Sequence, residues 1–296
     1  MTKKRKAAVA LGYFDGIHIA HRAVLGAALA QNENGLVPTV LLFDEPPAEA
    51  LTGVPVPRLM TDADRDRLLK ERGFTLKQAC FREIKDLPPE RFVDEILARD
   101  LKAAFVSCGY NYRFGKNGAG DASVLKTLCE KQGIEVSVLP ETDLDGSPVS
   151  SSRIRRLVED GDMDAAVRLL GRPLTFTSPV FTGDRRGRLL GAPTINQYLP
   201  ARFVRPKRGV YVSDVLLDGV WKRGVTNIGS RPTFDGLSFR AETFILGFEG
   251  DLYGKAVTVG LLHFLRPEMK FPDADALKAQ IAEDARLAAE YDPDNE

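Results

Sequence analysis

The sequence is poor in the features that mark several classes of protein. It has three cysteines in 296 residues, Cys80, Cys108 and Cys129, with no CxxC pair. This excludes a disulfide scaffold and predicts reduced thiols in a cytoplasm. Lysine plus arginine and aspartate plus glutamate number 41 each, so net charge gives no reason to expect nucleic acid or an anionic membrane as a partner. No apolar run approaches the ~18 residues of a membrane span. The oligomeric state is left open.

Histidine is also scarce, yet two of the three histidines stand close together. The apolar segment 6–14 ends at the turn Asp15-Gly16, and His18 and His21 follow at the start of a helical pattern. Imidazoles three residues apart lie on one side of a helix. At a helix N-terminus they suit charge that develops on a phosphoryl group. Two helix histidines without a catalytic role remain an open interpretation, whereas zinc is disfavoured because no cysteine is near.

The first half of the chain alternates between strand and helix patterns. Apolar, strand-like segments lie at 6–14, 37–43, 103–110 and 134–140, and helical patterns lie at 21–31, 62–73, 88–101, 121–133, 151–161 and 162–171. This alternation predicts a parallel sheet covered by helices, with ligands at the carboxyl ends of its strands.

After Gly171 the pattern changes to successive strands. They are predicted at 174–183, 209–229, 241–250 and 255–265, with a hairpin turn at Asp218-Gly219. Strands without intervening helices indicate an antiparallel sandwich or barrel. One helix closes the chain, with Asp273 as its N-cap and Leu277, Ile281 and Ala288 as its buried stripe. The pattern therefore predicts two domains, 1–171 and 172–296.

An ordered set of motifs resembles one family. The segments are GYFDGIHIAH, CGYNYRFGKNGAGD, VSSSRIRRLVEDGDMDAAVRLLGRP, VFTGDRRGRLLGAPTIN, VTNIGSRPTF, FEGDLYGKAV and LHFLRPEMKF. They resemble, in order and over nearly the whole chain, the bifunctional riboflavin kinase/FAD synthetase family of prokaryotes. The resemblance implies a Rossmann-like α/β nucleotidylyltransferase domain at 1–171 and an all-β barrel riboflavin kinase domain with a C-terminal helix at 172–296.

The kinase motifs carry residues of suitable chemistry. The loop TGDRRGRLLG combines glycines with arginines and suits a polyphosphate, although such a loop is more often solvated surface. Thr194 and Asn196 offer hard oxygen ligands for Mg²⁺ held with ATP, although a simple bend is also open. By resemblance, Glu242 is the catalytic base, and Arg266 and Glu268 lie near the flavin ring. The predicted binding residues of this half are Gly183, Arg186, Gly187, Gly191, Pro193, Thr194, Asn196, Arg266 and Glu268.

In the first half the resemblance assigns adenylyl transfer. His18, His21 and Arg153 would stabilise charge on the ATP phosphates, with Arg153 at the leaving pyrophosphate. Asn111 and Tyr112 match the segment expected near the flavin phosphate. The predicted binding residues of this half are Gly12, Phe14, Asp15, Gly16, Asn111, Tyr112, Ser151 and Ser152.

Two departures from the family pattern fall in this first half. Ala20 replaces the glycine of HxGH, and Pro46 replaces a histidine, with Glu45 beside it. The expected function is phosphorylation of riboflavin to FMN and adenylylation of FMN to FAD, both with ATP and Mg²⁺, with the second activity weakened. A kinase with a structural first domain and a non-catalytic flavin-binding regulatory module remain alternatives.

Overall fold

The chain divides into two compact units. A computed structural model describes residues 5–183, 193–233 and 236–292. The first unit comprises Met1–Val56 and Asp62–Ser150, and the second comprises Pro57–Thr61 and Ser151–Glu296. Helices α7 (Ser151–Asp160) and α8 (Met163–Leu170) therefore group with the second unit. The boundary after Gly171 remains a prediction about where the functional domains divide.

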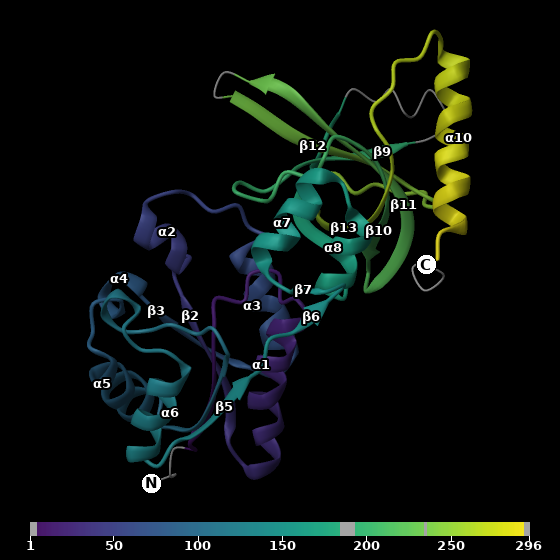
Figure 1. Cartoon of the computed structure of the whole chain (residues 1–296). Coiled ribbons are helices and arrows are strands. Elements are labelled where there is room, and N and C mark those ends of the chain that lie inside the picture. The colour runs from purple at the N-terminus through teal and green to yellow at the C-terminus, as the bar shows by residue number, and fades with distance from the viewer. Residues whose placement is uncertain (1–4, 184–192, 234–235, 293–296) are drawn as a thin grey trace. The chain divides into compact units, whose positions relative to one another are not determined.

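The first unit contains a parallel sheet of five strands in the order β3-β2-β1-β4-β5 (Figure 1). The strands are β1 (Ala7–Leu11), β2 (Val37–Phe43), β3 (Thr75–Ala79), β4 (Ala103–Gly109) and β5 (Glu135–Leu139). The predicted α/β class is confirmed. The sequence did not reveal β3, because TLKQA is a short, polar and largely exposed edge strand without an apolar pattern.

Helices surround this sheet. They are α1 (Ile19–Ala30), the 3₁₀ helix η1 (Gln31–Asn34), α2 (Pro47–Thr52), α3 (Asp62–Glu71), α4 (Phe81–Ile84), α5 (Pro89–Arg91), the π-helix η2 (Phe92–Asp100), the 3₁₀ helix η3 (Lys116–Gly118) and α6 (Ala122–Lys131). A short hairpin of β6 (Asp143–Leu144) and β7 (Ser147–Pro148) follows. Local signals explain the helix ends: the Asp121 carboxylate accepts the Val124 N–H at 2.9 Å to begin α6, as N-caps do.

The strand order identifies where this unit is expected to bind a ligand. Chain order reverses between β1 and β4, which are neighbours in the sheet. In open parallel sheets, ligands bind beyond the carboxyl ends of the strands at such a reversal. The segment Gly12–His18 follows β1, and the segment Tyr110–Phe114 follows β4. Two motifs distant in sequence thus leave adjacent strands at the same edge.

The second unit contains a closed antiparallel barrel, which resolves the choice between sandwich and barrel. Its strands are β8 (Leu174–Phe181), β9 (Thr194–Tyr198), β10 (Gly209–Leu217), β11 (Val220–Thr233), β12 (Gly236–Ile245) and β13 (Ala256–Arg266), in the order β10-β11-β12-β9-β8-β13. The predicted hairpin at Asp218-Gly219 joins β10 to β11, with both residues at positive φ. Strand β9 was not predicted, because the segment PTIN was interpreted only through its ligand atoms.

Helices cover parts of this barrel. Helix α8 packs against β13 and β8, and α10 (Ala274–Glu290) lies along β11 and β10 (Figure 1). The Asp273 carboxylate accepts the Ala276 N–H at 2.8 Å, which confirms it as N-cap. The predicted stripe of α10 needs a correction. Ala288 is buried, but Leu277 and Ile281 are only half-buried, because they line a cavity instead of packing fully against the barrel.

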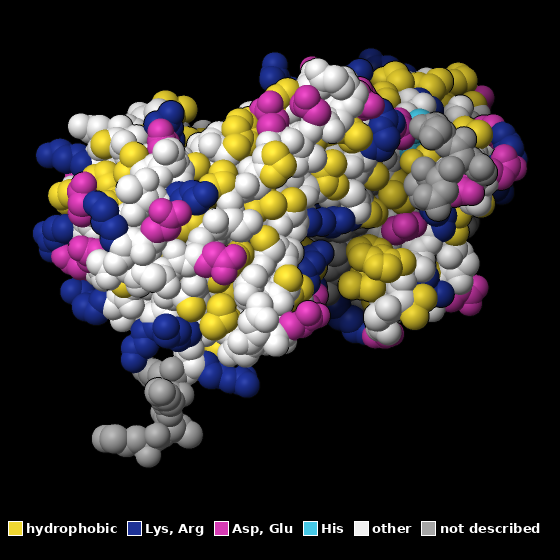
Figure 2. All heavy atoms as spheres, turned by 60° about the horizontal axis from the view of Figure 1, so that its bottom comes forward, with side chains coloured by type: hydrophobic (Ala, Val, Ile, Leu, Met, Phe, Trp, Pro, Cys, Tyr) yellow, Lys and Arg dark blue, Asp and Glu magenta, His cyan; other side chains and the backbone are white. Residues whose placement is uncertain are grey.

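The described residues include no membrane-spanning helix, and the face shown in Figure 2 has no surface of one charge sign. None of the helices in the described residues has the length and apolar content needed to cross a bilayer. On the face shown in Figure 2, basic and acidic side chains are interspersed, in keeping with the equal numbers of the two signs.

Candidate functional site

The turn after β1 has a strained backbone. Phe14 and Ile17 have φ values of 57° and 44°, a region that non-glycine residues rarely occupy, and Gly16 has φ 84°. The Phe14 side chain is buried and folds back over Gly12, where an added Cβ would lie 2.9 Å from the ring. Gly12 therefore has a packing reason to be glycine. Strain of this kind is concentrated at functional sites, where the surrounding structure maintains it.

His18 and His21 stack on each other at the start of α1. Their ring centroids are 3.5 Å apart with an interplanar angle of 16°. His18 is the N-cap, and its Nδ1 accepts the His21 backbone N–H at 3.3 Å. Because Nδ1 is an acceptor there, the proton of the neutral His18 ring resides on Nε2.

His21 is held in its neutral form. Burial, and secondly the adjacent His18, lower the pKa of His21 well below its ordinary value of 6.5. The His21 Nδ1 is buried and makes no hydrogen bond to any described residue. A buried polar atom without a partner is costly, so this atom is suited to a ligand.

The segment after β4 has one predicted site residue at the surface and one packed against the core. Asn111 is exposed, and the Tyr112 N–H donates to the Gly109 carbonyl at 3.1 Å in a tight turn. The Tyr112 ring stacks on Phe114 at 6.0 Å and packs against the core, and burial raises the pKa of its hydroxyl. Tyr112 thus contributes to packing, while Asn111 is accessible to a ligand.

The departures from the family pattern have local structural consequences. Pro46 precedes α2, and its carbonyl accepts the Ala50 N–H at 3.0 Å. The Glu45 carboxylate binds Arg82 through Nε at 2.6 Å and Nη2 at 3.2 Å. The negative charge of Glu45 is therefore balanced by a guanidinium. Ala20 lies in the first turn of α1, between the two histidines.

In the second unit, pairing of three strands creates a row of polar side chains. Glu242 on β12 lies opposite Asn196 on β9 and opposite Asn227 on β11. Directly opposed residues have Cβ atoms ~5 Å apart. Thr194 lies two residues before Asn196 and therefore on the same face of β9. Four residues from three strands thus face one region, and the sequence alone could not show that proximity.

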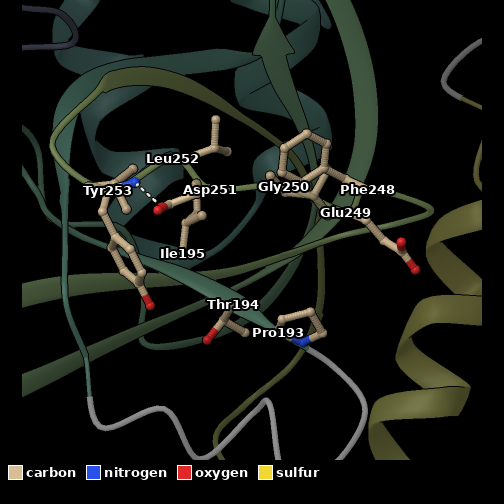
Figure 3. Close-up of a pocket in the computed structure, with 11 residues that line it drawn as sticks. Pro193, Thr194, Ile195, Phe248, Glu249, Gly250, Asp251, Leu252 and Tyr253 are labelled. Atoms are coloured by element: carbon tan, nitrogen blue, oxygen red, sulfur yellow. Dashed lines mark hydrogen bonds between the residues drawn. The ribbon is translucent and has the colours of Figure 1, made fainter.

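Two cavities meet at Thr194. One has a volume of about 390 Å³ and is lined by Thr194, Val210, Val225, Asn227, Glu242, Phe244, Arg266, Glu268, Met269, Phe271, Leu277, Ile281 and Asp284. The other, of about 480 Å³, is lined by Val180, Pro193, Thr194, Ile195, Ile245 and residues 248–253. Figure 3 shows Thr194 and the Tyr253 phenol on the same side of this second cavity. The first is largely apolar with a few polar groups, as small-molecule sites are.

Glycines close to these cavities allow close approach. An added Cβ on Gly183 would lie 2.5 Å from the Asn196 side chain, and one on Gly229 would lie 3.0 Å from Glu268 Oε1. The first contact places the start of the glycine-rich loop against Asn196. Arg186, Gly187 and Gly191 lie outside the described residues.

The structure also identifies residues that sequence reasoning missed. Asn227 stands beside Glu242, and Asp284 on α10 lines the same cavity as Arg266 and Glu268. Residues 248–253 line the second cavity. The motif VTNIGSRPTF pointed to the segment of Asn227 without giving that residue a role. Asp284 had no sequence signal beyond its place on an amphipathic helix.

The remaining predicted residues lie at a helix start in the second unit. Ser151, Ser152 and Arg153 form the first turn of α7; Ser151 and Arg153 are partly buried, and Ser152 is exposed. A helix N-terminus with hydroxyls suits a phosphate, so their assignment to the ATP phosphates stays a prediction.

Comparison with known proteins agrees with this division of sites. The family model described as FAD synthetase matches residues 1–153, and the model described as riboflavin kinase matches residues 170–291. Proteins named bifunctional riboflavin kinase/FMN adenylyltransferase are 32% identical over 93% of this chain in Listeria monocytogenes, covering 89% of that protein, and 36% identical over 94% in Pseudomonas fluorescens, covering 90%.

A solved structure has the same fold. A protein from Streptococcus pneumoniae, described as a macrolide-efflux protein, superposes with a TM-score of 0.87 at 32% identity, over 99% of this chain and 96% of that one. Sequence motifs, two-unit architecture and full-length relatives agree, and the chain belongs to the bifunctional riboflavin kinase/FMN adenylyltransferase family.

Proposed function

We propose that the chain phosphorylates riboflavin to FMN and then adenylylates FMN to FAD, using ATP in both steps. The observation that carries the kinase step is the row Asn196–Glu242–Asn227 beside Thr194, the residue shared by two cavities. The apolar cavity of about 390 Å³ suits a flavin ring, and the second cavity suits the nucleotide. The γ-phosphate would pass between them at Thr194.

Glu242 is the proposed base of the kinase step. It would take the proton from the terminal ribityl hydroxyl while that oxygen attacks the γ-phosphorus in line and ADP leaves. Asn196 and Asn227 stand on either side of Glu242 in the strand ladder. Their carboxamides would fix the carboxylate in position before the substrates arrive.

The donor set fits Mg²⁺ that arrives with ATP. Thr194 Oγ1 and Asn196 Oδ1 are hard oxygen ligands on one face of β9, the type that Mg²⁺ accepts together with phosphates and water. Among the described residues there is no cluster of three or more His, Cys, Asp or Glu that could hold a metal alone. When bound, Mg²⁺ would neutralise charge on the β- and γ-phosphates.

His18 and His21 are the proposed residues for adenylyl transfer in the first unit. The FMN phosphate oxygen would attack the α-phosphorus of ATP, and pyrophosphate would leave. His18, with its proton on Nε2, and the neutral His21 would donate hydrogen bonds to the phosphates as charge develops. The strained turn and the His18 cap support fixed positions for both rings. Arg153 is proposed to act on the leaving pyrophosphate.

One assay tests both steps. The full-length protein is incubated with riboflavin, ATP and Mg²⁺, or with FMN in place of riboflavin, and the flavins are separated by chromatography. We expect FMN and FAD from riboflavin, FAD from FMN, and neither product when EDTA is added. FMN without FAD would leave a kinase alone. Flavin binding without turnover would leave a binding module and overturn the proposal.

A further inference from the structure

Helix α10 contributes a wall to the proposed flavin cavity while being weakly buried. Leu277, Ile281 and Asp284 line that cavity. Within α10 only Asp284 and Ala288 are buried. The residues of α10 that face the cavity therefore need a nearby contact that holds the helix against the barrel. Asp284 is the buried residue nearest in sequence to Leu277 and Ile281, three positions after Ile281.

Asp284 is held by a directional ion pair. Arg266 at the end of β13 donates from Nε to Asp284 Oδ1 at 2.9 Å and from Nη2 to Oδ2 at 2.7 Å. Gln280 donates to Oδ1 at 2.9 Å. Asp284 is 3% exposed. A two-point contact of this kind fixes distance and orientation together, which apolar packing does not.

The same bonds occupy much of the Arg266 guanidinium. Nε and Nη2 bind Asp284, and Nη1 donates to the Pro267 carbonyl at 3.2 Å. The guanidinium carbon also lies 5.9 Å from the Phe271 ring centroid. Met269 and Phe271, in the segment that connects β13 to α10, also line the cavity. The Arg266–Asp284 ion pair therefore joins the two elements that this segment connects, on the side of the cavity that the segment closes.

We propose that Asp284 is a positioning residue for the flavin. By holding Arg266, it sets the distance of α10 from the barrel and keeps Leu277 and Ile281 at the cavity wall. The inference rests on the proposed riboflavin kinase function. In this role Asp284 does not contact the reacting atoms. Loss of Asp284 therefore weakens flavin binding and leaves the phosphoryl-transfer groups intact.

The test compares two neighbouring carboxylates of one helix. Asp284→Asn in the full-length protein is expected to raise the KM for riboflavin by about tenfold or more, with kcat and the KM for ATP within about twofold. Asp284→Glu should lie between wild type and Asp284→Asn. Glu283→Gln is the matched control, because Glu283 pairs with Arg286 at 2.7 Å on the exposed side of α10. It should retain the wild-type KM.

Further variants allow for loss of folding. Removing one partner of a buried ion pair is strongly destabilising, whereas replacing both by apolar residues is often tolerated. Arg266→Met/Asp284→Leu should fold, by near-ultraviolet circular dichroism, and still show the raised KM. Folded Asp284 variants with the wild-type riboflavin KM, or an equal rise in Glu283→Gln, would overturn the inference. If only Asp284→Glu folds, an unchanged KM overturns it.

Failure of the proposed kinase function can be distinguished from failure of the Asp284 inference. A wild-type protein that makes no FMN from riboflavin and ATP refutes the kinase proposal. Quenching of riboflavin fluorescence on binding then compares Asp284→Asn with Glu283→Gln directly. Equal riboflavin affinity in the two variants overturns the role of Asp284.

Discussion

The two proposed sites differ in what holds their side chains in place. In the second unit, Glu242, Asn196 and Asn227 are aligned by hydrogen-bonded ladders between three strands. In the first unit, His18 and His21 are arranged by one turn and the start of one helix. A ladder fixes register over many residues, whereas a local turn can change with a single substitution nearby. The departures Ala20 and Pro46 both fall in the locally held unit.

This contrast explains why we expect the activities to differ. Glu45, which accompanies Pro46, is paired with Arg82, so its charge is compensated at the surface. No other histidine takes the place of the family histidine that Pro46 replaces. The third histidine of the sequence, His263, lies on β13, where its Nδ1 is 2.7 Å from Asp164 Oδ1. The kinase motifs show no comparable departure.

The largest expected effect is at Glu242. Glu242→Gln should lower FMN formation by ~10²–10⁴-fold, the usual contribution of a general base, and Thr194→Ala should also remove most of it. FAD formation from supplied FMN is the internal control and should persist. Near-wild-type kcat of Glu242→Gln at saturating substrates would show that another group takes the proton.

The corresponding change in the first unit is His21→Ala. It should reduce FAD formation by ~10²–10³-fold, by analogy with removal of one donor to a developing charge. FMN formation should be unaffected in the same sample. Equal loss of both products would mean that the two sites are not independent, or that the variant is unfolded, which circular dichroism decides.

A time course with wild-type protein measures the comparison directly. FMN should accumulate well before FAD, because the departures affect only adenylyl transfer. Ala20→Gly and Pro46→His restore the family residues and should each accelerate FAD formation from FMN. Equal initial rates of FMN and FAD formation in the wild type would show that these departures have no effect.

Separately produced fragments of the chain sharpen the comparison of the two units. Residues 172–296 are expected to fold and phosphorylate riboflavin. Residues 151–296 should do so with a higher Tm, because α8 packs on β13 and β8 with Leu169 and Leu170 buried, and a buried leucine contributes about 1.5–3 kcal/mol. Thermal unfolding of both fragments measures this difference in Tm. An insoluble 172–296 would move the boundary to residue 151.

The smallest expected effect is a pH dependence of stability. The pKa of His21 is lowered below 6.5 on folding, so below pH 6.5 the unfolded chain binds a proton that the folded chain does not. The free energy of unfolding therefore falls as the pH falls, by at most about 1.4 kcal/mol per pH unit for one group. Urea unfolding at pH 7.5 and 5.5 measures this loss. His21→Gln should lose less stability than wild type over that range, and an equal loss would contradict the assignment.

Much of the fold could be predicted because its signals are local. The Asp218-Gly219 hairpin and the Asp273 cap were visible as short patterns, and the alternation of apolar segments indicated the parallel sheet. Strands β3 and β9 were missed because neither has a clear local strand pattern. TLKQA is a polar edge strand, and the PTINQY segment was interpreted only through the oxygen atoms of Thr194 and Asn196. The positions of β3 and β9 are set by pairing with β2, β8 and β12. These partner strands lie too far away in the sequence for a short segment to reveal the pairing.

The sequence by itself determined the two-part organisation, the turn and helix that present His18 and His21, and the chemical types in each motif. Only the tertiary structure decided that Glu242 lies between Asn196 and Asn227, that Thr194 is shared by two cavities, and that Asp284 clamps Arg266. The physical reason is range. Caps and turns depend on interactions within a few residues. In contrast, the pairing of Glu242 with Asn196 joins residues 46 positions apart, and the cavity that includes Thr194 and Asp284 joins residues 90 positions apart. Only closure of the barrel and packing of α10 against it bring these residues together.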